Sequence, residues 1–423
     1  MAVTATDIHR TIQAVFRIEQ AKLIAGLARI TRDVGLAEEL AQDALVAALE
    51  EWPRTGVPDK PGAWLTAAAK HRAIDRFRRD RMRERKHDEL GLEQQSLERD
   101  MPDFEGALDD DIGDDLLRLI FTACHPVLSP EARAALTLRL LGGLTTDEIA
   151  RAYLVAEPTI AQRIVRAKRT LSEAGVPFEV PHGDDRSERL GSVLDVIYLI
   201  FNEGYAATAG EDWMRLELSE EALRLGRVLA GLAPLEPEVH GLVALMEIAA
   251  SRFGARTDAD GEPILLLDQN RARWDQLLIR RGLAALALAE SLGGEAGPYQ
   301  LQAAIAACHA RARVAEDTDW PRIVMLYGAL AELIPSPVIE LNRAVAVGMA
   351  SGPAAGLELV DALNAEPALK SYHLLPSVRG DLLVKLGRYG EARIEFERAA
   401  SLTRNERERK LLLARATEAA AAK

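Results

Sequence analysis

The chain has 423 residues, which is enough for two to four domains with sizeable buried cores. Its composition, rich in Ala, Leu, Arg and Glu with only 5% aromatic residues, favours helices, and we expect an almost all-α protein. The net charge of −13 argues against a uniformly basic surface. No apolar run has the length of a membrane span or the pattern of a signal peptide, so we expect no membrane partner and a cytoplasmic location.

The first predicted unit, residues 8–83, consists of helices. Residues 36–52 (LAEELAQDALVAALEEW) form an amphipathic helix that Pro53 is expected to end. A Pro/Gly-rich loop follows over 54–61, and residues 62–83 form a long basic helix. The polar edge of the first of these two helices comprises Glu38, Glu39, Gln42 and Asp43. Such an edge is most often a solvated helix face.

Charge is distributed unevenly between this unit and the next. Residues 70–86 (KHRAIDRFRRDRMRERK) are strongly basic, whereas residues 88–115 are strongly acidic. A surface that binds nucleic acid depends on local charge rather than on the total. We therefore expect a basic helix followed by an acidic segment over 84–111. This segment either solvates a linker, which is the commoner case, or covers a basic face when no DNA is bound.

The second predicted unit, residues 112–175, ends in a helix-turn-helix pattern. Ser129 and Pro130 are typical of a helix start, and Gly142-Gly143 of a helix end. In 144–171 (LTTDEIARAYLVAEPTIAQRIVRAKRTL), Thr145 and Glu148 have the spacing of a capping box. The first helix of such a motif braces the second, which enters the major groove.

The second helix of this motif has an apolar stripe and a basic polar face. Guanidinium groups suit phosphates and guanine edges, and a glutamine amide suits adenine. A solvated amphipathic helix has a similar pattern, so this segment alone leaves DNA binding and simple solvation equally open. The polar face consists of Thr159, Gln162, Arg163, Arg166 and Arg169.

The third predicted unit, residues 187–420, is a large helical region. Residues 379–402 (RGDLLVKLGRYGEARIEFERAASL) indicate a helix, a Gly-centred turn and a helix, and a weaker relative begins near Leu341. The separation of Gly352 and Gly387 is close to the tetratricopeptide period of about 34 residues. Stacked antiparallel helices are therefore expected, with a brief hairpin or loop near 257–267.

Two motif blocks in this order resemble a known family. An acidic and apolar helix ending in Trp52, a Pro/Gly loop and AWLTAAAKHRAIDRFRR resemble region 2 of bacterial sigma factors. Residues 129–171 resemble region 4. The short linker without a further central domain resembles the extracytoplasmic-function group, and FTACHP, IYLIFNEGY and LGRYGEA resemble its subgroup with a long tetratricopeptide-like C-terminal extension.

The resemblance implies an alternative sigma factor that binds core RNA polymerase and promoter DNA and performs no catalysis itself. In this family region 4 reads the −35 element, which implies that role for the polar face of 159–169. The extension is implied to regulate the factor through a protein or small-molecule partner. For the −10 element the implied residues are Trp64, Lys70, Arg72, Arg76 and Arg79, and for core polymerase they are Glu39, Gln42 and Asp43.

The sequence departs from the family pattern at two places. Pro158-Thr159 stands where Gly-Thr is usual, and DQNR at 268–271 stands where DQDR is expected. Two other interpretations remain open. A one-component helix-turn-helix regulator with a sensing domain leaves 36–83 unexplained, and a helical-repeat scaffold predicts no salt-sensitive DNA affinity in the N-terminal half.

Residues suited to other chemistry are few. Cys124-His125 and Cys308-His309 are adjacent pairs without the spacing of zinc ligands. Neighbours in sequence converge poorly as a nucleophile and its base, so buried cysteines are expected. We find no phosphate-binding glycine motif, and we expect neither a metal nor a cofactor.

Overall fold

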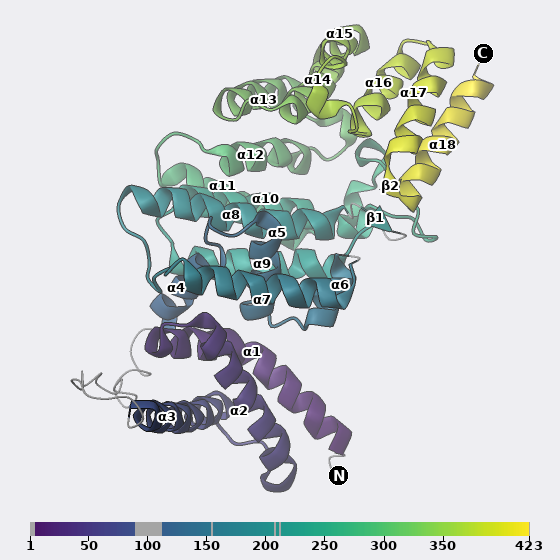
Figure 1. Cartoon of the computed structure of the whole chain (residues 1–423). Coiled ribbons are helices and arrows are strands. Elements are labelled where there is room, and N and C mark those ends of the chain that lie inside the picture. Colours follow the sequence, from purple (N-terminus) through teal and green to yellow (C-terminus); the bar gives the residue numbers. More distant parts are fainter. Residues whose placement is uncertain (1–4, 89–111, 154, 207–208, 211–212, 423) are drawn as a thin grey trace. The chain divides into compact units, whose positions relative to one another are not determined.

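The computed structural model describes residues 5–88, 112–153, 155–206, 209–210 and 213–422 (Figure 1). These residues form eighteen α-helices, five short 3-10 helices and one pair of two-residue strands. The all-α fold expected from the sequence is therefore confirmed. The chain divides into two compact units, Met1–Val196 and Ile197–Lys423, and the division falls inside α8 (Asp184–Tyr205).

The first unit begins with three packed helices, α1 (Ala5–Thr31), α2 (Val34–Thr55) and α3 (Pro61–Asp88). The Asp33 side chain caps α2 by accepting a hydrogen bond from the Leu36 backbone at 2.9 Å. α3 continues to Asp88, past the expected end at 83, and the predicted acidic linker falls mostly on 89–111, outside the described residues.

The prediction that Pro53 ends the second helix is wrong, because α2 continues to Thr55. Proline removes one backbone donor, which a helix tolerates near its end when the next residues still find acceptors. Here Gly56 N donates to Trp52 O at 2.9 Å, and the Thr55 hydroxyl donates to Glu51 O at 3.1 Å. Gly56, with a φ of 85°, then ends the helix.

Four helices follow: α4 (Ile112–Ala123), α5 (Pro130–Leu140), α6 (Thr146–Ala152) and α7 (Glu157–Glu173). Ser129 caps α5, and the predicted capping box of α6 is present, with Glu148 N donating to Thr145 Oγ1 at 3.1 Å and Thr145 N donating to Glu148 Oε2 at 2.6 Å. Ala156 precedes α7 without a side-chain cap. Leu154, whose apolar side chain would be expected to pack against the second helix of the motif, lies outside the described residues.

The first half of α8 packs within the first unit. Ser192 Oγ donates to the Cys124 carbonyl at 2.6 Å, and Arg189 Nη2 donates to the Phe121 carbonyl at 3.0 Å. Leu190, Val193 and Leu194 are buried. The helices of 112–173 therefore depend on residues up to about 196 for part of their core.

The second unit is a succession of packed helix pairs. Its α-helices are α9 (Leu216–Leu232), α10 (Pro237–Ala250), α11 (Gln276–Ser291), α12 (Pro298–Arg311), α13 (Trp320–Leu333), α14 (Pro337–Ser351), α15 (Pro353–Leu363), α16 (Leu374–Lys385), α17 (Tyr389–Leu402) and α18 (Glu406–Ala421). Its 3-10 helices are η1 (Phe253–Ala255), η2 (Leu266–Asp268), η3 (Arg271–Arg273), η4 (Ala315–Asp317) and η5 (Pro367–Leu369). Strands β1 (Ala209–Gly210) and β2 (Arg404–Asn405) pair in parallel.

The two Gly-centred helix pairs predicted near the C-terminal end are confirmed as α14–α15 and α16–α17. Gly352 and Gly387 adopt positive φ values of 100° and 72°, which glycine reaches without a steric cost. A Cβ on Gly356 would lie 2.8 Å from Gly348 Cα, so glycine at this crossing lets α14 and α15 approach closely.

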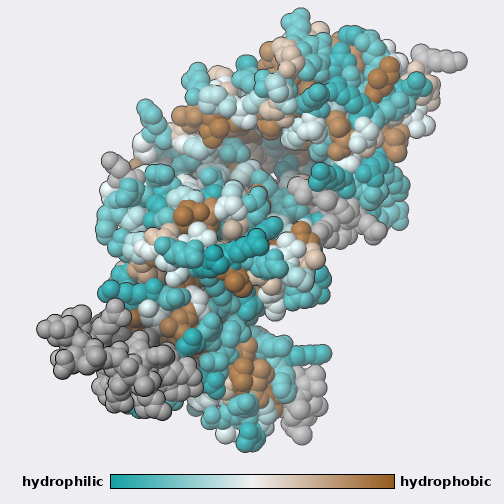
Figure 2. Space-filling model, in the orientation of Figure 1, coloured by the Kyte–Doolittle hydropathy of each residue, from teal (hydrophilic) through white to brown (hydrophobic). Residues whose placement is uncertain are grey.

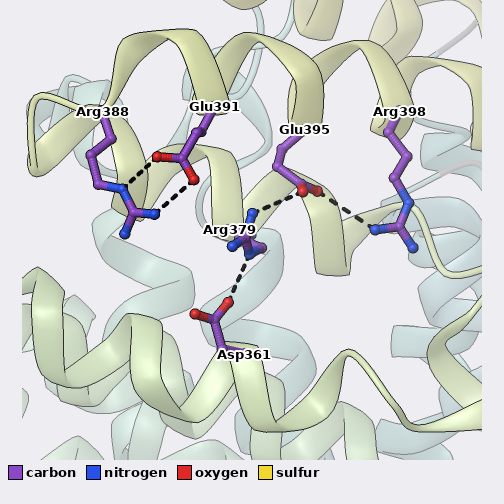
Figure 3. A network of polar contacts seen from close by, with 6 residues as sticks. All are labelled: Asp361, Arg379, Arg388, Glu391, Glu395 and Arg398. Carbon is purple, nitrogen blue, oxygen red and sulfur yellow. Dashed lines mark hydrogen bonds and ion pairs between the residues drawn. The ribbon is translucent and has the colours of Figure 1, made fainter.

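Ion pairs join consecutive helices of this region (Figure 3). Arg379 of α16 donates to Asp361 of α15 at 2.7 Å and to Glu395 of α17 at 2.9 Å. Glu395 also lies 3.7 Å from Arg398, and Arg388 pairs with Glu391 at 2.7 Å. One guanidinium thus links three successive helices.

The expected hairpin or loop near 257–267 is a short antiparallel bridge between Thr257 and Pro263, turned at Gly261 with a φ of 78°. The face in Figure 2 is mostly hydrophilic, and its brown areas are small and separate. Isolated exposed apolar side chains of this kind are normal on a protein surface.

Candidate nucleic-acid interface

Helix α7, the second helix of the predicted helix-turn-helix, has a buried stripe and an exposed polar face, as the sequence predicts. Ile160, Ile164, Ala167 and Leu171 are buried. On the opposite side Thr159, Gln162, Arg166 and Arg169 are exposed, and Arg163 is half-buried. Arg169 pairs with Glu173 of the same helix at 2.9 Å, whereas Arg163 and Arg166 form no ion pair with any described residue. Two guanidinium groups are therefore available on this face.

Val165 is a residue of this face that the sequence reasoning missed. Its side chain is 64% exposed, and it follows Gln162 by three positions and precedes Arg169 by four. An exposed apolar side chain between such polar residues suits a thymine methyl group in the major groove. Sequence reasoning missed Val165 because it is apolar but lies outside the apolar stripe of α7.

The remaining basic residue of α7, Lys168, has a different environment. Lys168 Nζ and Arg139 Nε of α5 both meet the carboxylate of Glu38 on α2, the latter at 2.6 Å. Glu38 is only 4% exposed. The sequence placed Glu38 on a polar solvent-facing edge, and that placement is wrong because two cations from α5 and α7 enclose it.

Two of the arginines predicted for the −10 element pair with acidic residues predicted for polymerase. Arg76 of α3 lies 2.7 Å from Glu39 of α2, and Arg72 lies 3.8 Å from Asp43. Both pairs are largely exposed. The structure therefore brings these two predicted sets together as facing edges of α2 and α3.

The remaining residues predicted for the −10 element have different surroundings. Trp52 is buried, and its ring meets that of half-buried Trp64 edge to face, with centroids 5.3 Å apart. Trp64 thus packs in the core with part of its ring accessible. Lys70 is half-buried, and the side chain of Arg79 lies outside the described residues.

The exposed edge of α2 is formed by Glu39, Asp43 and, more shallowly, Gln42. Val46, three positions after Asp43, is 47% exposed and extends this edge with an apolar contact surface. Aliphatic and charged side chains side by side are typical of a protein interface. Sequence reasoning missed Val46 because it counted only polar residues.

The cysteines are buried, as expected from the sequence. Burial raises the pKa of the Cys124 thiol to about 11, so at neutral pH this thiol is protonated and unreactive. Within the described parts of the chain no group of three or more His, Cys, Asp or Glu side chains is placed to hold a metal ion.

Two segments of the chain match known protein families. The family described as Sigma-70 region 2 matches residues 15–83, and Sigma-70, region 4 matches residues 118–171. The ECF RNA polymerase sigma factor SigL of Mycobacterium tuberculosis is 32% identical over 155 residues, covering 35% of this chain and 81% of that protein. SigK of Mycobacterium ulcerans is 30% identical over 169 residues, covering 38% and 85%.

The chain belongs to the extracytoplasmic-function group of sigma-70 factors. It carries regions 2 and 4 in its first unit and a long helical C-terminal extension. An uncharacterised protein of Rhizobium meliloti (strain 1021) is 45% identical over 387 residues, which cover 90% of this chain and 89% of the relative, so the extension is shared with it. Residues 189–290 match a family of unknown function, DUF6596, and no solved structure matches the chain.

Membership of this group makes the chain a sigma factor for promoter recognition, with core RNA polymerase and promoter DNA as its partners. Sigma factors are not enzymes, because the polymerase supplies the chemistry. Among the helices that the structure describes, none is long and apolar enough to cross a membrane.

Proposed function

We propose that this sigma factor reads the −35 element with the exposed face of α7, and that Arg163 and Arg166 make its principal contacts. The observation that supports this is that neither arginine forms an ion pair with a described residue, whereas Arg169 pairs with Glu173. An unpaired guanidinium binds a guanine edge or a phosphate without first losing a protein partner.

The −10 element is proposed to bind the α3 side of the first unit, with Trp64, Lys70, Arg72, Arg76 and Arg79 as contacts. Arg72 and Arg76 are held by exposed ion pairs to α2, and such pairs contribute little, about 0–1 kcal/mol each. Phosphates of the opened strand replace these carboxylates at small cost. Core polymerase is proposed to bind the edge formed by Glu39, Gln42 and Asp43, together with Val46.

The proposed contacts to DNA predict that promoter affinity depends on salt. Contacts to phosphates release counterions, so promoter affinity falls as salt rises, and each lost phosphate contact lowers the slope by about 1. Electrophoretic mobility shift at several salt concentrations, on promoter DNA selected by run-off transcription with core polymerase, measures this slope. A slope unchanged by replacing both Arg163 and Arg166 with Ala contradicts the proposed −35 contact.

The extension is proposed to set the fraction of molecules able to initiate transcription. Its packed helix pairs, linked by ion pairs such as Asp361–Arg379–Glu395, form a stable surface of the kind that helical repeats use to bind partners. Promoter and polymerase contacts are proposed for regions 2 and 4, so a different role is proposed for these helices.

A truncation tests this proposal only if α8 is retained. A chain ending at Pro181 would lose Arg189, which donates to the Phe121 carbonyl of α4, and Ser192, which bonds to the Cys124 carbonyl and to Arg133 of α5. Region 4 would therefore be less stable. A chain ending at Ala206 keeps these contacts, and Ile197, Ile200 and Phe201 are then replaced by polar residues to restore solubility.

Run-off transcription compares the 206-residue chain with the full chain at equal concentrations of DNA-binding molecules. A change of about fivefold or more in transcripts per bound molecule, in either direction, supports regulation by the extension. Equal transcription from the same promoters, under growth conditions that induce the factor and those that do not, contradicts it. Normal promoter affinity in both chains confirms that region 4 remains folded.

A further inference from the structure

The second unit contains a cavity of about 560 Å3. Helices α8, α10, α12, α13 and α14 line it, together with residues near η2 and η3. Figure 1 shows α12, α13 and α14 following one another through this unit. The volume lies within the range of small-molecule sites, about 300 to 1,000 Å3, and such sites are often found between packed helices.

The charge of this cavity is one-sided. Its described lining contains Arg252 and no aspartate or glutamate. The guanidinium of Arg252 lies over the rings of Trp274 and Tyr205, at 5.9 and 5.5 Å, and forms no ion pair or hydrogen bond with another described residue. Its Nε atom is buried without a hydrogen-bond partner. An uncompensated cation at a cavity wall favours an anionic occupant.

One more group in the lining carries a donor that no described residue accepts. The hydroxyl of Tyr327 donates to no described residue, and burial raises its pKa to about 12, which keeps it a donor at neutral pH. Trp274 is 3% exposed and its Nε1 atom is enclosed by the protein, so this residue contributes ring surface rather than a donor. A cation and a neutral donor in one lining favour an oxygen-rich ligand.

Apolar side chains of the same lining account for the rest of such a ligand. Leu245 and Ile248 of α10 and Ile305 of α12 supply apolar surface. By contrast, the hydroxyl of Tyr198 already donates to Gln302 Oε1 at 3.2 Å, so these two polar groups are occupied. Apolar walls with a few convergent polar groups are the usual pattern of a binding site for an organic molecule.

We infer that this cavity binds a small organic carboxylic acid, whose carboxylate meets Arg252 and Tyr327 and whose aromatic or aliphatic body lies against Leu245, Ile248 and Ile305. One cation matches one carboxylate, and the neutral hydroxyl of Tyr327 donates to a remaining lone pair. Binding is a property of the extension alone, so its test is independent of promoter recognition.

Isothermal titration calorimetry of the full chain tests the ligand class. Phenylacetate, benzoate and hexanoate are each compared with the matching amide, which has the same body without the charge. At least one acid is expected to bind about ten- to a hundredfold more tightly than its amide, the usual effect of a charge-assisted hydrogen bond. Equal binding of acids and amides, binding of inorganic phosphate alone, or no binding by any acid at millimolar concentration overturns the inference.

Three variants locate the site. Arg252→Gln is expected to abolish the preference for acid over amide, and Tyr327→Phe to weaken acid binding several-fold while leaving the ring in place. Ala306→Phe fills the cavity and is expected to remove both acid and amide binding. Arg273→Gln is the control, because Arg273 is exposed on η3 and does not line the cavity. If Arg252→Gln fails to fold, Tyr327→Phe and Ala306→Phe test the site instead. Wild-type affinity for the acid in both of these variants overturns the assignment to this cavity.

Discussion

The two helices proposed to contact DNA, α3 and α7, differ in how their arginines are held. On α7, Arg163 and Arg166 form no described ion pair, whereas on α3, Arg72 and Arg76 pair with Asp43 and Glu39 of α2. A helix that is basic in sequence therefore forms a basic surface only where neighbouring carboxylates do not pair with its cations. Facing carboxylates partly neutralise α3, while the positive charge of α7 remains available.

A third arrangement links the two regions. Glu38 of α2 is enclosed by Arg139 of α5 and Lys168 of α7, so within the first unit region 2 contributes a buried carboxylate to region 4. Its neighbour Glu39 lies on the exposed side of the same helix. Adjacent glutamates thus have opposite environments, which makes them a matched pair for experiments.

The largest expected effect follows from Glu38→Gln. This change leaves Arg139 and Lys168 without their counter-charge in a mostly buried position, and we expect a loss of about 2 to 4 kcal/mol in the opening free energy of α2, α5 and α7. Hydrogen–deuterium exchange of peptides from these helices measures it. Glu39→Gln, the control, is expected to cost less than about 1 kcal/mol. Similar losses in both variants would show that the buried triad has no special importance.

The next effect concerns promoter affinity. Arg163→Ala is expected to weaken binding to promoter DNA by about 1–3 kcal/mol, because a bidentate contact to a base is lost. Arg169→Ala should cost less, since Arg169 already pairs with Glu173. Fluorescence anisotropy with labelled promoter DNA compares the two at one salt concentration. Equal losses would contradict the distinction between free and paired arginines on α7.

The third effect concerns polymerase. The double variant Gln42→Ala, Asp43→Ala is expected to weaken binding to core RNA polymerase by about 1–2 kcal/mol, the size usual for interface residues that matter. Glu51→Ala is the control, because Glu51 is exposed on α2 well away from this edge. Biolayer interferometry with immobilised core enzyme provides the affinity. Wild-type affinity of the double variant for core polymerase would show that this edge of α2 is solvated surface and not a polymerase contact.

Local signals in the sequence predicted local structure well. The capping box of Thr145 and Glu148 and the turns at Gly352 and Gly387 lie where expected, because each depends on a few neighbouring residues. Pro53 was misjudged, since whether a helix survives a proline depends on how close it lies to the helix end. The buried stripe of α7 was likewise predicted from helical spacing alone.

Features that depend on distant residues were not predictable. Glu38 gave no sign that cations 101 and 130 positions later would enclose it, because sequence spacing says nothing about tertiary partners. The cavity draws its wall from residues as far apart as Tyr198 and Tyr372. A sequence indicates which side chains can donate or accept, but the packing of helices decides which of them remain unpaired.

The smallest expected effect is the coupling between Arg76 and Glu39. Their atoms lie 2.7 Å apart, but both side chains are about half exposed, so water and salt screen the pair. A double-mutant cycle of Arg76→Ala and Glu39→Ala should give about 0.2–1 kcal/mol in the free protein. In the promoter complex, a phosphate that takes the place of Glu39 should reduce this coupling to near zero.

The same cycle distinguishes a DNA contact from a structural pair. If Arg76 binds phosphate, Arg76→Ala lowers the salt slope of promoter binding by about 1, and Glu39→Ala strengthens binding slightly by freeing the guanidinium. If Arg76 stays with Glu39, the coupling persists in the complex and the slope does not change. That result would assign Arg76 to the packing of α2 on α3, and α7 would then supply most of the electrostatic attraction for the promoter.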